Sequence, residues 1–138
     1  MNLSYIEVLV KKRESTEVEF KISTGQLERG METLCAFLNG DGGMVVFGVD
    51  DDGNIVGQQV ADKTKRQIAE CLRQFEPFPL VDIDYVAVEK DRYVVVLSVA
   101  NNREKPYLYK GKAYRRSDTA TIEVDQTELK RLILEGGN

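Results

Sequence analysis

The chain has 138 residues, a net charge of −4 and the mixture of hydrophobic and charged residues that is typical of globular proteins. This length suits one hydrophobic core, so we expect a single domain over residues 1–138. Histidine is absent, which excludes imidazole bases, Ser-His-Asp triads and histidine metal sites. No apolar run approaches the ~20 residues that span a bilayer, and the N-terminus lacks a signal-peptide pattern. We therefore expect a cytoplasmic protein without membrane contact.

Hydrophobic periodicity predicts alternating helices and strands in the first half of the chain. It indicates helices over residues 4–12 and 27–38 and strands over residues 17–22 and 44–49. Ser4 is the expected N-cap of the first helix. The strand over residues 17–22 alternates strictly, which places Glu19 and Lys21 on one polar face. Basic residues 11–13 are interpreted as a solvated helix end.

The second half of the chain continues this mixture. The pattern predicts helices over residues 63–75 and 126–134, strands over residues 80–88 and 93–99, and an extended basic segment around residues 106–116. Asp125 is the expected N-cap of the last helix, with Leu129, Leu132 and Ile133 facing inward. Because strict strand–helix alternation is missing, the fold class is α+β. We expect one mixed sheet of about six strands covered by three or four helices.

Carboxylates gather at the ends of two predicted strands. Glu14 and Glu19 flank the start of one strand, and Asp50 and Asp51 follow another. If the strands are neighbours, these acids converge, and a carboxylate cluster of this kind suits the oxygen-ligand preference of Mg²⁺ or Mn²⁺. The alternative is that they are solvated acids of turns and strand edges. The spacing leaves both interpretations open.

Three further groups are candidates for phosphate contact. Lys21 either neutralises a phosphate or pairs with Glu19. Gly42 and Gly43 lie in a turn that follows a helix and precedes a strand, which is the reverse of a P-loop and excludes a Walker-type ATPase. The basic, aromatic segment containing Tyr114, Arg115 and Arg116 is either a nucleic-acid contact or an edge strand protected by charges.

Taken together, these blocks resemble a known family. They are Glu14-Ser15 with Glu19-Phe20-Lys21, Ala36-Phe37-Leu38-Asn39 with Gly42-Gly43, Phe47 to Gly57, Pro106-Tyr107, and Tyr114-Arg115-Arg116. Their order is similar to that of the Schlafen AlbA-like DNA-binding domain, also described as a divergent AAA ATPase-like domain. The resemblance extends over about residues 10 to 134. Ser117-Asp118 departs from it, since the family commonly has a glycine after the Tyr-x-Arg block.

The resemblance implies an α+β domain that binds DNA or RNA, of the kind found in transcriptional regulators. The residues implied to contact nucleic acid are Lys21, Asn39, Gly42, Gly43, Tyr114, Arg115 and Arg116. Animal Schlafen proteins use two such lobes to form one groove, so a homodimer is the corresponding expectation for a single lobe. Binding alone implies no cofactor.

The same resemblance implies an alternative, a divalent-metal-dependent ribonuclease. Its three carboxylates fall on Glu14, Glu19 and Asp51, which would be both catalytic residues and ligands of Mg²⁺ or Mn²⁺. A third possibility is a protein-interaction domain, which the acidic composition favours. The sequence leaves open whether this domain cuts RNA or only binds.

Overall fold

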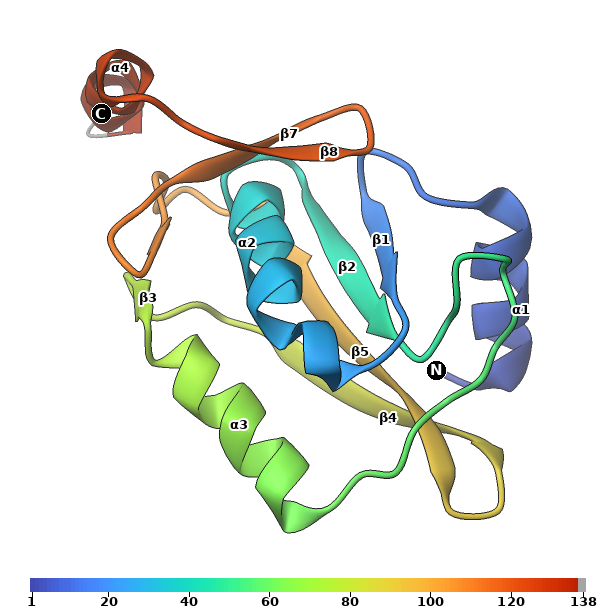
Figure 1. Cartoon of the computed structure of the whole chain (residues 1–138). Helices are drawn as coiled ribbons and strands as arrows, with labels where there is room; N and C mark the ends of the chain where they lie inside the picture. The colour runs from blue at the N-terminus through green and yellow to red at the C-terminus, as the bar shows by residue number, and fades with distance from the viewer. Residues whose placement is uncertain (137–138) are drawn as a thin grey trace.

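The structure, a computed structural model, describes residues 1–136 (Figure 1). Its centre is a four-stranded mixed sheet in the order β1-β2-β5-β4. These strands are β1 (Val18–Lys21), β2 (Gly42–Phe47), β5 (Arg92–Ala100) and β4 (Asp82–Glu89). β1 runs parallel to β2, and the other pairs are antiparallel. The strand that carries Glu19 and Lys21 is therefore an edge of the sheet.

Two smaller ladders complete the β structure. β3 (Phe75–Glu76) pairs with β6 (Leu108–Tyr109), and β7 (Tyr114–Ser117) forms a hairpin with β8 (Ala120–Glu123). The predicted α+β class is confirmed. The strands are divided among one four-stranded sheet and two ladders, whereas the sequence suggested a single sheet of about six, because β3 pairs with β6 and β7 with β8 and not with the central sheet.

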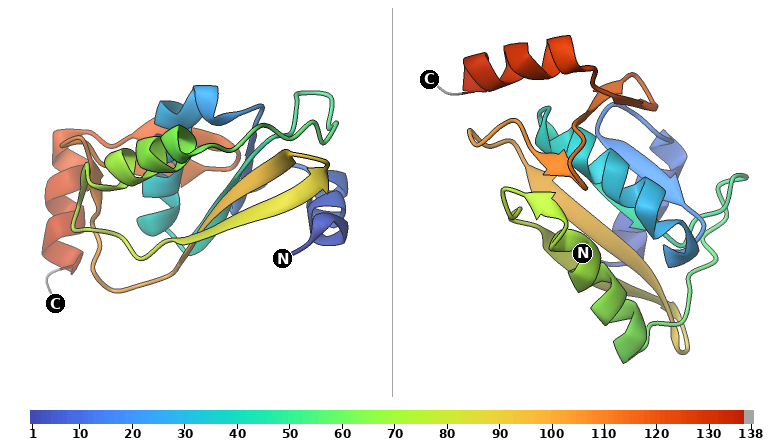
Figure 2. Two further views of the ribbon diagram at one scale, coloured as in Figure 1. Left: turned by 90° about the horizontal axis from the view of Figure 1, so that it is seen from below. Right: turned by 60° about the vertical axis from the view of Figure 1, so that its left-hand side comes forward.

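Helices cover the two faces of the central sheet unequally (Figures 1 and 2). α2 (Leu27–Leu38) and α3 (Asp62–Leu72) lie on one face, and the short 3-10 helix η1 (Thr24–Gln26) leads into α2. α1 (Leu3–Lys12) packs on the opposite face. None of the helices in the described part of the chain has the length and apolar character that a bilayer crossing requires.

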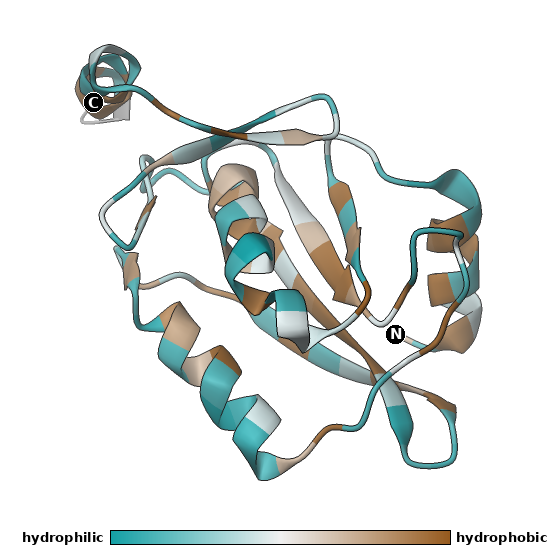
Figure 3. Cartoon of the chain, in the orientation of Figure 1, coloured by the Kyte–Doolittle hydropathy of each residue, from teal (hydrophilic) through white to brown (hydrophobic). Residues whose placement is uncertain are grey.

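The core consists of two apolar clusters separated by the sheet, visible as brown strands between the helices in Figure 3. Alternation along β2 sends Val45 and Phe47 toward α2 and Val46 toward α1. β2 and β5 are thus buried on both faces, as their nearly continuous apolar sequences predict. This double burial fixes the register of β2, and hence the position of its neighbour β1.

The helix ends show where local sequence signals succeed and fail. α2 has the predicted bounds, and Asp125 caps the last helix, α4 (Gln126–Gly136), by accepting the Glu128 N–H at 2.8 Å. The prediction of Ser4 as the first N-cap is wrong, because Asn2 Oδ1 accepts the Tyr5 N–H at 3.0 Å. The prediction that the Ile133 side chain faces inward is also wrong. That side chain is 52% exposed, because α4 lies apart from the sheet (Figure 2).

Gly30 provides a test of the α2 packing. A Cβ atom there would lie 2.5 Å from Cζ of Phe47, whose ring is fully buried. We expect Gly30→Ala to lower the free energy of unfolding by about 1–2 kcal/mol, because overpacking exceeds the gain in helix propensity. Gly40→Ala is the matched control, since its nearest contact would be an ordinary 3.4 Å. Equal urea midpoints for the two variants would contradict this packing.

Candidate functional site

The edge strand β1 divides its side chains between the two faces of the sheet. Val18 and Phe20 pack with the cluster under α1. Alternation therefore places Glu19 and Lys21 on the α2 face, as the sequence predicted. There Lys21 Nζ lies 3.9 Å from Glu19 Oε2, and both side chains are mostly buried. The two polar residues of the strand thus form one charged pair beside α2.

Arg116 joins this pair from the β7–β8 hairpin. Its guanidinium lies over the Phe37 ring of α2, 5.2 Å from the ring centroid, and its side chain is only 6% exposed. Nη1 donates to Glu19 Oε2 at 3.3 Å and to Thr121 Oγ1 at 3.1 Å. Nη2 donates to the carbonyl oxygen of Ser15 at 3.0 Å and to that of Val18 at 3.3 Å. The arginine therefore fastens the hairpin to the start of β1.

A second acid completes the cluster. Glu14 Oε2 accepts the Phe20 N–H at 3.0 Å, and the Glu14 and Glu19 carboxyl groups are hydrogen-bonded to each other. Burial, followed by the hydrogen bond to Glu14, raises the pKa of Glu19 to about 7, although Arg116 opposes this rise. Burial also acts on Glu14, but the bonds from Glu19 and Phe20 outweigh it and lower the pKa of Glu14. The two carboxyl groups therefore share one proton, carried by Glu19.

Asp51 lies on the α1 side of the sheet, whereas Glu19 and Arg116 meet on the α2 side. It lies in the turn after β2, where the carboxylate of Asp50 accepts the N–H groups of Asp52 and Asn54 at 3.0 and 2.8 Å. This turn and the end of α1 enclose a pocket of about 580 Å³ that Glu14, Phe20 and Asp51 line. Glu19 faces the opposite way, toward Arg116. Glu14 is thus the acid that both contacts Glu19 and lines the pocket with Asp51.

The fit of a divalent cation can be judged from these positions. Within residues 1–136, no group of three or more Cys, Asp or Glu side chains could hold a metal ion. Glu19 is turned toward a guanidinium, and Asp51 lies beyond the β1 edge. Glu14, Glu19 and Asp51 as arranged do not fit Mg²⁺ or Mn²⁺, and we derive no catalytic step through a metal.

Three other residues that were predicted to contact nucleic acid hold parts of the fold together. Asn39 accepts the Tyr107 N–H at 2.6 Å and donates to the carbonyl oxygens of Tyr107 and Tyr114, each at 3.0 Å. A Cβ at Gly42 or Gly43 would lie within 2.7 Å of a neighbouring carbonyl oxygen. The Asn39 amide thus anchors the segment that precedes β7, and the two glycines permit close packing of β2.

Tyr114 and Arg115, two candidates on β7 for contact with nucleic acid, differ in exposure. Tyr114 is buried in the core beside α2. Arg115 points outward and pairs with Glu128 of α4, with Nε 3.0 Å from Oε1. Contacts of these residues with nucleic acid stay predictions, as do those of Lys21, Asn39, Gly42, Gly43 and Arg116.

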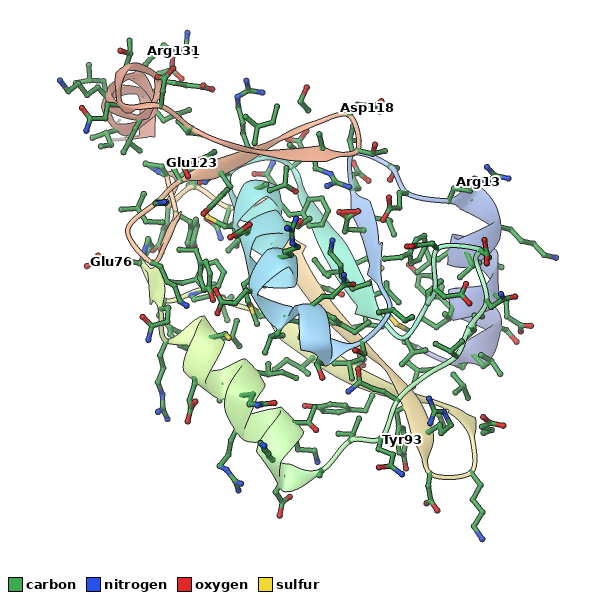
Figure 4. The ribbon with its side chains drawn as sticks, in the orientation of Figure 1. Arg13, Glu76, Tyr93, Asp118, Glu123 and Arg131 are labelled. Atoms are coloured by element: carbon green, nitrogen blue, oxygen red, sulfur yellow. The ribbon has the colours of Figure 1, made fainter. Side chains whose placement is uncertain are left out.

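Sequence reasoning missed the cations that line the pocket. Lys11 and Arg13 lie at the end of α1 and belong to the pocket lining. Figure 4 labels Arg13, whose side chain extends outward from the end of this helix. The run over residues 11–13 is exposed, as expected of a solvated helix end, but its charge pattern alone gives no sign of the pocket. For Arg116 a signal was available, because strand alternation puts it on the same face as Tyr114, an aromatic residue.

The buried arginine can be tested against its exposed neighbour. Arg116→Gln removes the closer of the two cations that contact Glu19 and the hydrogen bonds of Arg116 to the start of β1, and we expect a loss of about 3 kcal/mol in the free energy of unfolding. Arg115→Gln removes a surface pair and should cost at most about 1 kcal/mol. Urea unfolding at neutral pH measures both. Similar losses would show that the hairpin does not depend on the Arg116–Glu19 contact.

The shared proton predicts a dependence of stability on pH. Folded Glu19 holds its proton to a pKa of about 7, whereas an unfolded glutamate loses it near 4.5. The folded state binds more protons between these values, so this stabilising contribution is present at low pH and lost as pH rises through 7. The lowered pKa of Glu14 acts only below this window.

We expect the wild type to lose stability relative to Glu19→Gln when the pH is raised from about 5 to about 8. Urea unfolding of both proteins across that range measures the difference. Parallel pH curves would contradict the shared proton.

Comparisons with known proteins place this geometry in a family. The model of the family described as Schlafen, AlbA_2 matches residues 14–125. No curated protein matches the chain. Two solved structures share the fold. One is the N-terminal domain of a protein from Nitrosomonas europaea that is described as a 'putative ATP-dependent DNA helicase RecG-related protein'. It has 26% identity and a TM-score of 0.61, with 85% of this chain and 88% of that chain covered.

The second structure is the DIP2311 protein from Corynebacterium diphtheriae, with 17% identity and a TM-score of 0.58. The match covers 86% of this chain but only 24% of that protein, so the present domain spans about a quarter of its length. This likeness concerns the fold alone. The family match includes Glu14, Glu19, Asp51 and Arg116, and it covers most of the sequence. The chain belongs to the Schlafen AlbA_2 family.

Proposed function

We propose that this domain binds nucleic acid, with DNA as its ligand, through the edge formed by β1 and the end of α1. The observation that carries nucleic-acid binding is the family match over residues 14–125, which contains the acid and arginine cluster. The end of α1 precedes this match, and its part in the proposal is supported by its exposed cations. The name of the Nitrosomonas relative, a DNA helicase type, supports DNA as the ligand. A role in transcriptional regulation and a homodimer are further parts of this proposal.

Exposed cations without an ion-pair partner support a local binding site for phosphate. In the described part of the chain, Lys11, Lys12 and Arg13 are exposed and have no ion-pair partner within 4 Å. Arg115 and Arg116, by contrast, already bind carboxylates. With a net charge of −4, the chain lacks a broad basic face, so binding depends on a few positions such as these.

The ribonuclease alternative retains one favourable observation. Glu14 and Glu19 share a proton, and Glu14 lines the same pocket as Asp51. A carboxyl pair with separated pKa values is a common arrangement of acid–base chemistry. Since the three acids do not fit a metal as arranged, RNA cleavage stays a prediction of the sequence.

Binding is tested by the fluorescence anisotropy of labelled single- and double-stranded DNA and of RNA with the same sequence. We expect DNA to bind at low salt, with log K falling linearly with log salt and a slope of about −2 to −3, since two or three phosphates meet Lys11, Lys12 and Arg13. No binding to any strand at low salt would overturn the proposal. Tighter binding of RNA than of DNA would overturn its DNA part.

A further inference from the structure

Arg13 has a backbone conformation that is reserved almost entirely for glycine. Its φ is 66° and its ψ is 179°, and its N–H donates to the carbonyl oxygens of Leu9 and Val10 at the end of α1. For a residue with a Cβ atom this region is strained. Glycine is the common residue just past a helix end, because it accepts positive φ without strain. An arginine that occupies this position therefore points to a role for its side chain.

Arg13 also lines the rim of a pocket that is formed by cationic, acidic and apolar residues. Lys11 and Arg13 supply cations from the end of α1. Glu14 and the acids of the turn after β2, Asp50, Asp51 and Asp52, supply carboxylates, and Phe20 supplies apolar surface together with Val10 and Val49. Neither cation forms a salt bridge anywhere in residues 1–136, although carboxylates line the same pocket. The cations of this pocket are therefore not neutralised by a direct ion pair.

Unpaired cations beside an apolar surface match the phosphate and the base of a nucleotide. We infer that the pocket binds one nucleotide unit of a single DNA strand, with its phosphate on Lys11 and Arg13 and its base in the pocket. The inference rests on the nucleic-acid binding proposed above and names the place where a strand enters the site. The phosphate stays at the cations, because the carboxylates repel it from the interior.

The remaining walls suit the other parts of the nucleotide. Asp51 and Glu14 offer acceptors to amino groups of a base, and Phe20 offers an apolar face for its ring. The pocket volume, about 580 Å³, is within the usual range of small-molecule sites. Because Asp50 is bonded within its own turn, the wall that carries Asp51 is already ordered before a strand arrives.

The backbone of Arg13 permits a test that separates binding from folding. Arg13→Gly removes the cation and at the same time relieves the strained backbone, so the melting temperature should equal or exceed that of the wild type. Its affinity for a short labelled single-stranded DNA should fall about fivefold at 0.1 M salt, with a salt slope smaller by about 0.7, since one phosphate contact is lost. Arg13→Lys keeps the charge and should bind nearly as well as the wild type.

The matched control is Arg73→Gln, which removes an exposed cation at the end of α3, on the other side of the sheet from α1 (Figure 1). Affinity and salt slope should be unchanged in this variant. A second readout is NMR, in which the backbone amides of Val49, Gly53 and Arg13 should shift when the DNA is added, because these residues line the pocket.

The outcomes distinguish the two proposals. A wild type that binds DNA while Arg13→Gly binds equally well overturns the nucleotide pocket and leaves nucleic-acid binding intact. Equal losses in Arg13→Gly and Arg73→Gln overturn the pocket as well, because they indicate a diffuse charge effect. A wild type that binds no strand overturns the proposed function, and the pocket with it.

Discussion

The contact between the Arg116 guanidinium and the Glu19 carboxyl group is the interaction on which the rest of the site depends. It joins the β7–β8 hairpin to an edge strand that has a hydrogen-bonded neighbour on one side only. The arginine also bonds two backbone carbonyl groups at the start of β1, so one side chain orders the segment that carries Glu14. Removing either partner would leave a polar group buried without its counterpart, which is far more costly than losing a surface pair.

This contact gives the two sides of the β1 edge different properties. On the α2 side, the charges are paired internally and the Glu14–Glu19 proton is retained to near-neutral pH. On the α1 side, cations and carboxylates line one pocket without pairing. Glu14 connects the sides, because its carboxylate belongs to both. A ligand is therefore expected on the α1 side, where binding does not have to break an existing ion pair.

Much of the fold follows from sequence periodicity, whereas the site follows only in part. The helix over residues 27–38 and the doubly buried strand after it were predictable because burial imposes clear patterns on them. The alternation that places Glu19 opposite Phe20 was predictable for the same reason. The basic segment leaves a nucleic-acid contact and a charged edge strand both open for Arg116, because a charge pattern does not reveal which charge has a buried partner. The backbone of Arg13 was not predictable, since lysine and arginine are common at helix ends.

A crystal structure of the protein with a short single-stranded DNA tests the central claim most directly. The expected result is a phosphate hydrogen-bonded to the Arg13 guanidinium and a base in the pocket beside Phe20, with Arg116 still bonded to Glu19. A strand that lies along the β7–β8 hairpin, with Arg116 turned away from Glu19 toward a phosphate, would contradict it.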